Sequence, residues 1–148
     1  MKTISQSRLS QWILILAIIA YAIYAAIFIY QSSFVYEGER IFILFDDATI
    51  SMQYARNLAH GFGPNWNTYG DRVEGFTNPL WVAYMALFHL LPLSSAVIAL
   101  PLQISGAISV ILCMVVVKKI ADFLSEGNVW VSSLAVLTTA FYYPLSNW

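Results

Sequence analysis

Three long apolar runs separated by polar segments organise the chain. The first, residues 11–30, has no charged side chain, and at about 1.5 Å per residue its length matches the roughly 30 Å hydrocarbon core of a bilayer. The other two runs cover residues 95–117 and 129–146. The pattern predicts three transmembrane helices, with residues 118–128 as the turn between the second and the third.

A fourth apolar run, residues 79–91, is too short to cross the bilayer, since a helix of this length measures only about 20 Å. The distribution of positive charge also indicates that this run does not cross the bilayer. Residues 1–10 carry Lys2 and Arg8, which predicts a cytoplasmic N-terminus. If 79–91 does not cross, Lys118 and Lys119 are also cytoplasmic, and residues 31–94 form one extracytoplasmic loop. A cleaved signal peptide is the alternative for 11–30, but the run is long for one and no small-x-small site follows it.

Composition narrows the class of protein. Hydrophobic residues make up 59% of the 148 and charged residues only 10%, which is too apolar for a soluble domain of this size. The sequence therefore predicts an all-α integral membrane protein in contact with membrane lipid. The net charge of −1 and the lack of a basic stripe argue against a nucleic-acid partner.

The long loop contains two predicted juxtamembrane helices, at about 47–60 and 79–91. Helical spacing gathers polar positions of the first on one arc and small apolar positions opposite, so this helix is expected to lie flat on the membrane. The polar arc comprises Asp46, Thr49, Gln53, Arg56, Asn57 and His60; the opposite side comprises Ala48, Met52, Ala55 and Ala59. His60 is expected to cap the helix C-terminus, where Gly61-Phe62-Gly63-Pro64 ends the helix. An interfacial anchor without further function is the simpler interpretation.

The adjacent carboxylates Asp46 and Asp47 carry the functional hypothesis. They follow the apolar run 41–45 directly, and two carboxylates close to lipid are unfavourable without a proton or a partner cation. Helical spacing points them in different directions, because Asp47 falls near Ser51 and Tyr54 rather than on the polar arc. Acids in such a position are candidates for catalysis.

The residues around this pair resemble a known family. The stretch FDDATISMQYARNLAHGFG, with NWN after it and then RVEGFTNPLW from Arg72 to Trp81, is similar to the first outer loop of bacterial membrane glycosyltransferases of the GT-C superfamily. The resemblance includes arabinofuranosyltransferases of the mycobacterial type and, more remotely, protein mannosyltransferases, the lipid A aminoarabinose transferase and the catalytic subunits of oligosaccharyltransferases. Some twenty positions agree in order and spacing.

The resemblance implies a fold, a reaction and a location. The chain would be the N-terminal portion of a GT-C fold in the bacterial inner (cell) membrane, with its catalytic loop outside the cytoplasm. The implied enzyme is a transferase of the cell envelope that moves a sugar from a polyprenyl phosphate donor to a glycan, lipid or protein acceptor with inversion. Because family members have many more spanning helices, the 148 residues alone are expected to be inactive. A small non-enzymatic accessory membrane protein is the alternative.

Individual residues receive roles by the same resemblance. Asp46 and Asp47 are the candidate catalytic residues, as general base or as ligands of a divalent cation (Mg, Mn or Ca), and the motif leaves open which of them is the base; a metal-free mechanism is equally open. The candidate substrate-binding residues are Arg56, Arg72, Glu74 and Asn78. Glu74 could orient a sugar hydroxyl or pair with Arg72. Thr49, Met52 and Gln53 depart from the family's usual aromatic and Phe-Arg, a loss of positive charge for which Arg56 or Arg72 would compensate.

Overall fold

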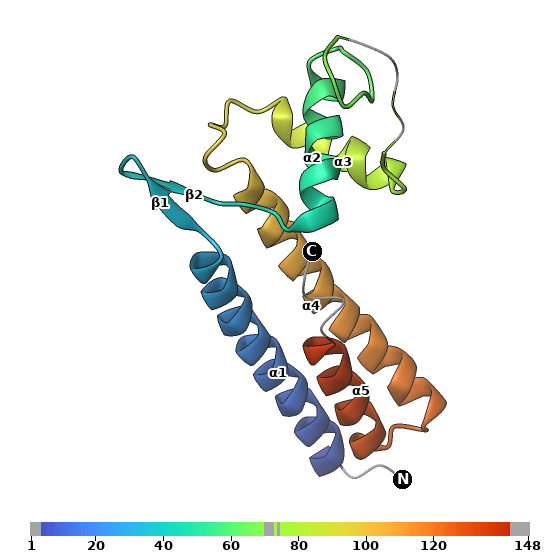
Figure 1. The fold of residues 1–148 in the computed structure, drawn as a ribbon. Coiled ribbons are helices and arrows are strands. Elements are labelled where there is room, and N and C mark those ends of the chain that lie inside the picture. Colours follow the sequence, from blue (N-terminus) through green and yellow to red (C-terminus); the bar gives the residue numbers. More distant parts are fainter. Residues whose placement is uncertain (1–3, 70–72, 74, 143–148) are drawn as a thin grey trace. The chain divides into compact units, whose positions relative to one another are not determined.

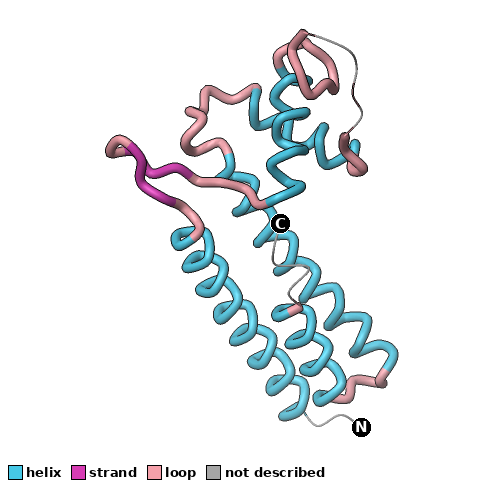
Figure 2. Tube along the Cα trace, viewed as in Figure 1, coloured by secondary structure: helices cyan, strands magenta, loops and turns pink. Residues whose placement is uncertain are grey.

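The computed structural model describes residues 4–69, 73 and 75–142, without the side chains of residues 4–7 and 46. This part of the chain is mostly helical, with one small β-hairpin (Figures 1 and 2). The all-α class predicted from the sequence is confirmed at this level. The chain divides into two compact units, one formed by Met1–Tyr30 with Ile104–Trp148 and the other by Gln31–Gln103. They are called the first unit and the second unit below.

Three helices build the first unit: α1 (Ile4–Gln31), α4 (Ala99–Leu124) and α5 (Val129–Phe141). The ends of α1 and α4 extend into the second unit. Each helix contributes two residues to one buried cluster, which consists of Ala17, Tyr21, Val110, Met114, Val136 and Ala140. Small alanines alternate with larger side chains in this cluster, and the three helices can therefore pack closely.

Two helices of the chain are long and apolar enough to cross a membrane, over Arg8–Gln31 and Ala99–Leu124. Their large apolar side chains face outward, and Trp12, Leu16 and Leu112 are each about 60% exposed. A core helix of a soluble protein would bury such residues. The third predicted span is helical only over Val129–Phe141, which is about 20 Å long at 1.5 Å per residue; residues 143–146 of that span lie outside the described residues.

The turn predicted from residue 118 begins later. Helix α4 continues to Leu124, so Lys118 and Lys119 are helical, and the prediction of a turn at these positions is wrong. The physical reason is an i, i+4 pair, because Lys118 Nζ lies 2.6 Å from a carboxylate oxygen of Asp122. Asp122 also accepts a hydrogen bond from the Ser132 hydroxyl of α5. These contacts tie the end of α4 to the start of α5.

The second unit begins with a hairpin that the apolar pattern did not predict. Strands β1 (Phe34–Tyr36) and β2 (Glu39–Ile41) pair antiparallel, with Phe34 opposite Ile41. The turn residues Glu37 and Gly38 both have positive φ, 49° and 84°, the combination that a two-residue turn with the twist of the strands requires. The FVYEGERI stretch contains the turn signal in its Glu-Gly pair, but each strand is too short to show a period.

Helices α2 (Asp46–Ala59) and α3 (Pro79–His89) pack against each other. Their bounds lie within two residues of the two predicted juxtamembrane helices, and Pro79 starts α3 at a position where its missing N–H costs nothing. Buried Ala48 and Ala55 of α2 share a cluster with Val82, Met85 and Ala86 of α3. The small apolar side of α2 is therefore covered by α3.

Candidate functional site

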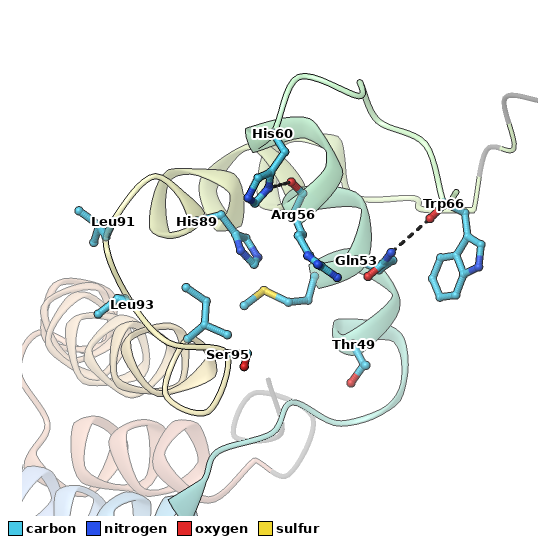
Figure 3. A pocket seen from close by; sticks show the side chains of 11 residues that line it. Thr49, Gln53, Arg56, His60, Trp66, His89, Leu91, Leu93 and Ser95 are labelled. Carbon is cyan, nitrogen blue, oxygen red and sulfur yellow. Dashed lines mark hydrogen bonds between the residues drawn. The ribbon is translucent and has the colours of Figure 1, made fainter. Parts of the chain in front are cut away.

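A cavity of about 780 Å³ lies within the second unit, a volume typical of ligand pockets. Helix α2, the C-terminal end of α3 and the segment that follows α3 surround it (Figure 3). Its lining residues are Thr49, Met52, Gln53, Arg56, His60, Trp66, His89, Leu91, Leu93, Ser95 and Ile98.

Four positions of the predicted polar arc, Thr49, Gln53, Arg56 and His60, line this cavity. Their spacing of four, three and four residues keeps them on one face of α2. Asn57, expected on the same arc, is buried instead, and its side-chain amide donates to the carbonyl oxygens of Asn65 and Trp66 at 2.7 and 2.9 Å. The polar arc therefore divides into a cavity face and an anchor for the loop after α2.

His60 caps the C-terminus of α2, as predicted, and its Nδ1 lies 2.7 Å from the carbonyl oxygen of Arg56. Since a carbonyl can only accept, Nδ1 carries the hydrogen of this bond. The Nε2 atom of His60 is left for other partners. Gly61, with φ of 83°, follows directly and ends the helix in the left-handed conformation.

The ring of His89 lies next to the ring of His60 in the lining of the cavity. The ring centroids are 6.5 Å apart, in an edge-to-face arrangement. The Nε2 atom of His89 is buried and has no hydrogen-bond partner within the described part of the chain. Burial, followed by the nearby His60 and Arg56, lowers the pKa of His89 below its ordinary value, and the backbone carbonyl of Met52 partly opposes this. Neither histidine is among the site residues predicted from the sequence. They come together only because α3 packs on α2.

The cavity combines a polar side with an apolar side. The guanidinium of Arg56 and the two histidines lie on the polar side, and Met52, Leu91, Leu93 and Ile98 lie on the apolar side. No aspartate or glutamate lines the cavity among the described residues. The lining thus suits a ligand that carries negative charge at one end and hydrocarbon at the other.

The predicted acidic pair occupies the start of α2. Asp46 is its first residue, and its side chain lies outside the described atoms. Asp47 is exposed and does not line the cavity. The N-terminal end of a helix stabilises negative charge through its free backbone N–H groups. Among the described residues, no group of three His, Cys, Asp or Glu side chains could hold a metal ion, and the predicted divalent cation has no ligand set there.

Two of the four predicted substrate-binding residues, Arg72 and Glu74, lie outside the described residues. Arg56 lines the cavity. Asn78 does not; its side-chain oxygen accepts a hydrogen bond from the Ser51 hydroxyl at 3.1 Å. Asn78 therefore links the start of α3 to α2.

Tyr54 holds the loop between α2 and α3. Its side chain is 1% exposed, its hydroxyl donates to the carbonyl oxygen of Val73 at 2.9 Å, and its ring lies 4.8 Å from that of Phe76 and 5.8 Å from that of Trp66. A Cβ added at Gly75 would come within 2.6 Å of the Tyr54 hydroxyl oxygen. The glycine of the VEGF stretch is thus required by close packing.

The chain was compared with protein-family models, with curated proteins and with solved structures, and none of them matches it.

Proposed function

We propose that this chain is the N-terminal portion of a GT-C-type membrane glycosyltransferase, which transfers a sugar from a polyprenyl phosphate to an acceptor outside the cytoplasm with inversion. The proposal rests on the motif around Asp46 and Asp47 and places the protein in the bacterial inner membrane. In this interpretation α1, α4 and α5 are membrane spans, and the second unit carries the extracytoplasmic site.

A single observation carries the proposal: one helix presents both chemical groups that glycosyl transfer from a phosphate requires. Helix α2 begins with the two aspartates, and Arg56, on a later turn, lines a cavity with an apolar wall. An acceptor hydroxyl needs a carboxylate to take its proton, and a departing phosphate needs positive charge, which guanidinium supplies with matching geometry.

The mechanism assigns separate roles to the aspartates and to Arg56. An aspartate accepts the proton of the acceptor hydroxyl while the hydroxyl oxygen attacks the anomeric carbon from the face opposite the phosphate. The bond between that carbon and the phosphate oxygen breaks, and Arg56 balances the negative charge left on the phosphate. The apolar side of the cavity accommodates the first part of the polyprenyl chain.

Helical spacing favours Asp46 over Asp47 as the base. Asp46 precedes Thr49 by three positions and Gln53 by seven, the spacing of residues that share a helix face, and both of those residues line the cavity. Asp47 is exposed outside the cavity lining. We assign the role of general base, which accepts the proton of the acceptor hydroxyl, to Asp46. Asp47 receives a supporting electrostatic role.

The test measures sugar transfer from a polyprenyl phosphate sugar in membranes that contain the complete product of the native gene. Asp46→Asn should lower the rate by about 10²- to 10⁴-fold, the usual contribution of a general base, and Asp47→Asn by less. Glu39→Gln in the hairpin is the matched control, since it removes one exposed carboxylate of the same unit and should leave the rate unchanged.

Retention of full transfer by the double variant Asp46→Asn, Asp47→Asn would sink the catalytic assignment. It would instead favour the alternative, in which the chain is a non-enzymatic accessory protein of a transferase.

A further inference from the structure

We propose that the β-hairpin after α1 is a membrane-interface anchor, whose aromatic face lies in the phospholipid headgroup layer. The aromatic face is the side of the hairpin that carries Phe34, Tyr36 and Ile41. The inference rests on one premise of the proposed function, that α1 crosses a membrane. The hairpin takes no part in the assigned glycosyl transfer, and its partner is the phospholipid surface.

The register of the hairpin gathers its apolar side chains. Phe34 is opposite Ile41, and Val35 is opposite Arg40. Residues directly opposite one another in an antiparallel pair project to the same face, and alternate residues of one strand share a face. Phe34, Tyr36 and Ile41 therefore lie on one face, whereas Val35 and Arg40 lie on the other.

The aromatic side chains of this face are exposed. Phe34 is 47% exposed and Tyr36 is 60% exposed, and neither buried cluster of the described residues contains a residue of the hairpin. A two-stranded hairpin without a core is marginally stable at best in water. The hairpin is therefore expected to gain stability from an apolar surface outside the described part of the chain.

A charge-free run connects α1 to the first strand and limits where that strand can lie. No charged residue or histidine occurs between Arg8 and Glu37. Helix α1 ends at Gln31, and Phe34 is three positions later, so an extended chain carries it at most about 11 Å past the helix end. The headgroup region on each side of a bilayer is roughly 5–8 Å thick. If α1 crosses the bilayer, the first strand therefore starts in or beside this region.

The residue types match an interface between lipid and water. Tyr30, in the last turn of α1, is 60% exposed, and tyrosine is favoured at the headgroup level because it combines an apolar ring with a polar hydroxyl. Glu37 and Glu39 are exposed at and beside the turn of the hairpin, and their carboxylates require water. The hairpin is thus apolar where it joins α1 and acidic at its turn, which favours an orientation with the turn in water.

The experiment measures the depth of single side chains in a bilayer with a nitroxide label. The chain has one cysteine, Cys113, so Cys113→Ser provides a background without cysteine. Single cysteines are then introduced by Ile19→Cys, Phe34→Cys, Val35→Cys, Tyr36→Cys or Glu37→Cys. The full chain is placed in phosphatidylcholine nanodiscs. Collisions of each label with oxygen, which concentrates in lipid, are compared with collisions with a nickel chelate, which stays in water.

The proposal predicts an order of depth. The ratio of oxygen to nickel collisions should be highest for the label at Ile19, which is a half-exposed position of α1, intermediate at Phe34 and Tyr36, and lowest at Glu37. The ratio at Val35 should resemble that at Glu37, because alternate side chains of a strand project to opposite faces. This alternation identifies the face that contacts lipid.

A matched pair of substitutions tests what the aromatic face contributes to stability. Phe34→Ser should lower the hydrogen-exchange protection of the hairpin amides in nanodiscs by about tenfold, as expected when one large apolar side chain loses part of its burial. Val35→Ser, on the other face, should lower it less. Protection of α2 reports whether the rest of the second unit has kept its fold. Equal losses in the two variants would overturn the proposal.

The collision data also identify other occupants. Infrequent collisions with both reagents at Phe34 and Tyr36 would show that a protein surface covers the aromatic face, such as a second copy of the chain, and would overturn the proposal. Nickel collisions at these positions as frequent as at Glu37 would place the hairpin in water and would also overturn it. Frequent nickel collisions at Ile19 would contradict the membrane span itself. Because none of these measurements involves sugar transfer, the aspartate variants test the proposed function separately.

Discussion

In the first unit, Leu16 of α1 and Leu112 of α4 are 62% and 60% exposed, whereas in the second unit Tyr54, Val82 and Met85 are each 1% exposed. Water would penalise the first arrangement, because exposed apolar surface costs about 25 cal/mol per Å². The second arrangement is that of an ordinary folded domain. The first unit therefore exposes large apolar side chains along α1 and α4, whereas the second unit buries large side chains in its own core.

The polar groups show the same contrast. In the first unit, Lys118, Asp122 and Ser132 bond to one another where α4 is joined to α5. In the second unit, polar side chains either anchor a loop, as Asn57 does, or line the cavity, as Arg56 does. Polar side chains of the first unit thus bond to one another, whereas some polar side chains of the second unit line a candidate ligand cavity.

The strongest test of independent folding is Tyr54→Ala. Loss of this buried ring should cost about 3–5 kcal/mol and lower hydrogen-exchange protection in α2 and α3. Peptides of α1 should keep their protection, since stability differs locally within a structure. Tyr69→Ala, at a side chain that is 86% exposed, is the control. An equal loss of protection in α1 would show that the two units do not fold independently.

A smaller effect is expected in the first unit from Lys118→Gln. Lys118 is paired with Asp122, and its side chain is only 13% exposed, so its replacement should cost about 1 kcal/mol, the upper end for exposed pairs. Lys119→Gln, at the neighbouring exposed position, should cost almost nothing. Thermal unfolding of α4 and α5 in micelles measures both variants, and equal melting temperatures would contradict a stabilising role for the pair.

The next effect depends on pH and belongs to the second unit alone. Because the pKa of His89 is lowered in the folded chain, the unfolded chain binds more protons between that pKa and the ordinary value near 6.5. The stability of this unit should therefore decrease as the pH falls through this window. His89→Gln should flatten the dependence of α2 and α3 protection on pH, while protection in α1 should show no such dependence in either protein.

The smallest effects concern two Glu-Gly turns, one in each unit, in which both residues have positive φ. Glu37 and Glu126 have φ of 49° and 52° and precede Gly38 and Gly127. Asparagine tolerates this left-handed conformation better than glutamate does. Glu37→Asn and Glu126→Asn should each stabilise their own unit by about 0.5 kcal/mol, measured by hydrogen exchange. A destabilisation at either turn would argue against backbone strain there.

Much of the helical layout could be predicted from the sequence because the apolar runs are long. Helix α2 starts at the Asp-Asp pair and α3 starts at Pro79, and α2 ends just before His60 and the glycines that come after it. The hairpin was missed since three-residue strands show no period. The packing of the small apolar side of α2 on α3 was not predicted, because period alone cannot distinguish a face covered by lipid from one covered by another helix.

Of the cavity residues Arg56, His60 and His89, the sequence could place two on one face, because Arg56 and His60 stand four residues apart and necessarily share a helix face. His89 comes from another helix, twenty-nine positions after His60 in the chain, and local spacing contains no signal for that contact. The role of Asn78 was likewise unpredictable, because its partner Ser51 becomes known only when α2 and α3 are packed.

The close approach of Gly75 to Tyr54 has a consequence for the evolution of this chain. A methyl group at position 75 would overlap the phenol oxygen, so residues 54 and 75 cannot change size independently. Homologues should therefore pair glycine at 75 with a large ring at 54, and any homologue with a bulkier residue at 75 should carry a smaller one at 54. Such paired substitutions would make these two positions a marker for recognising distant members of the lineage.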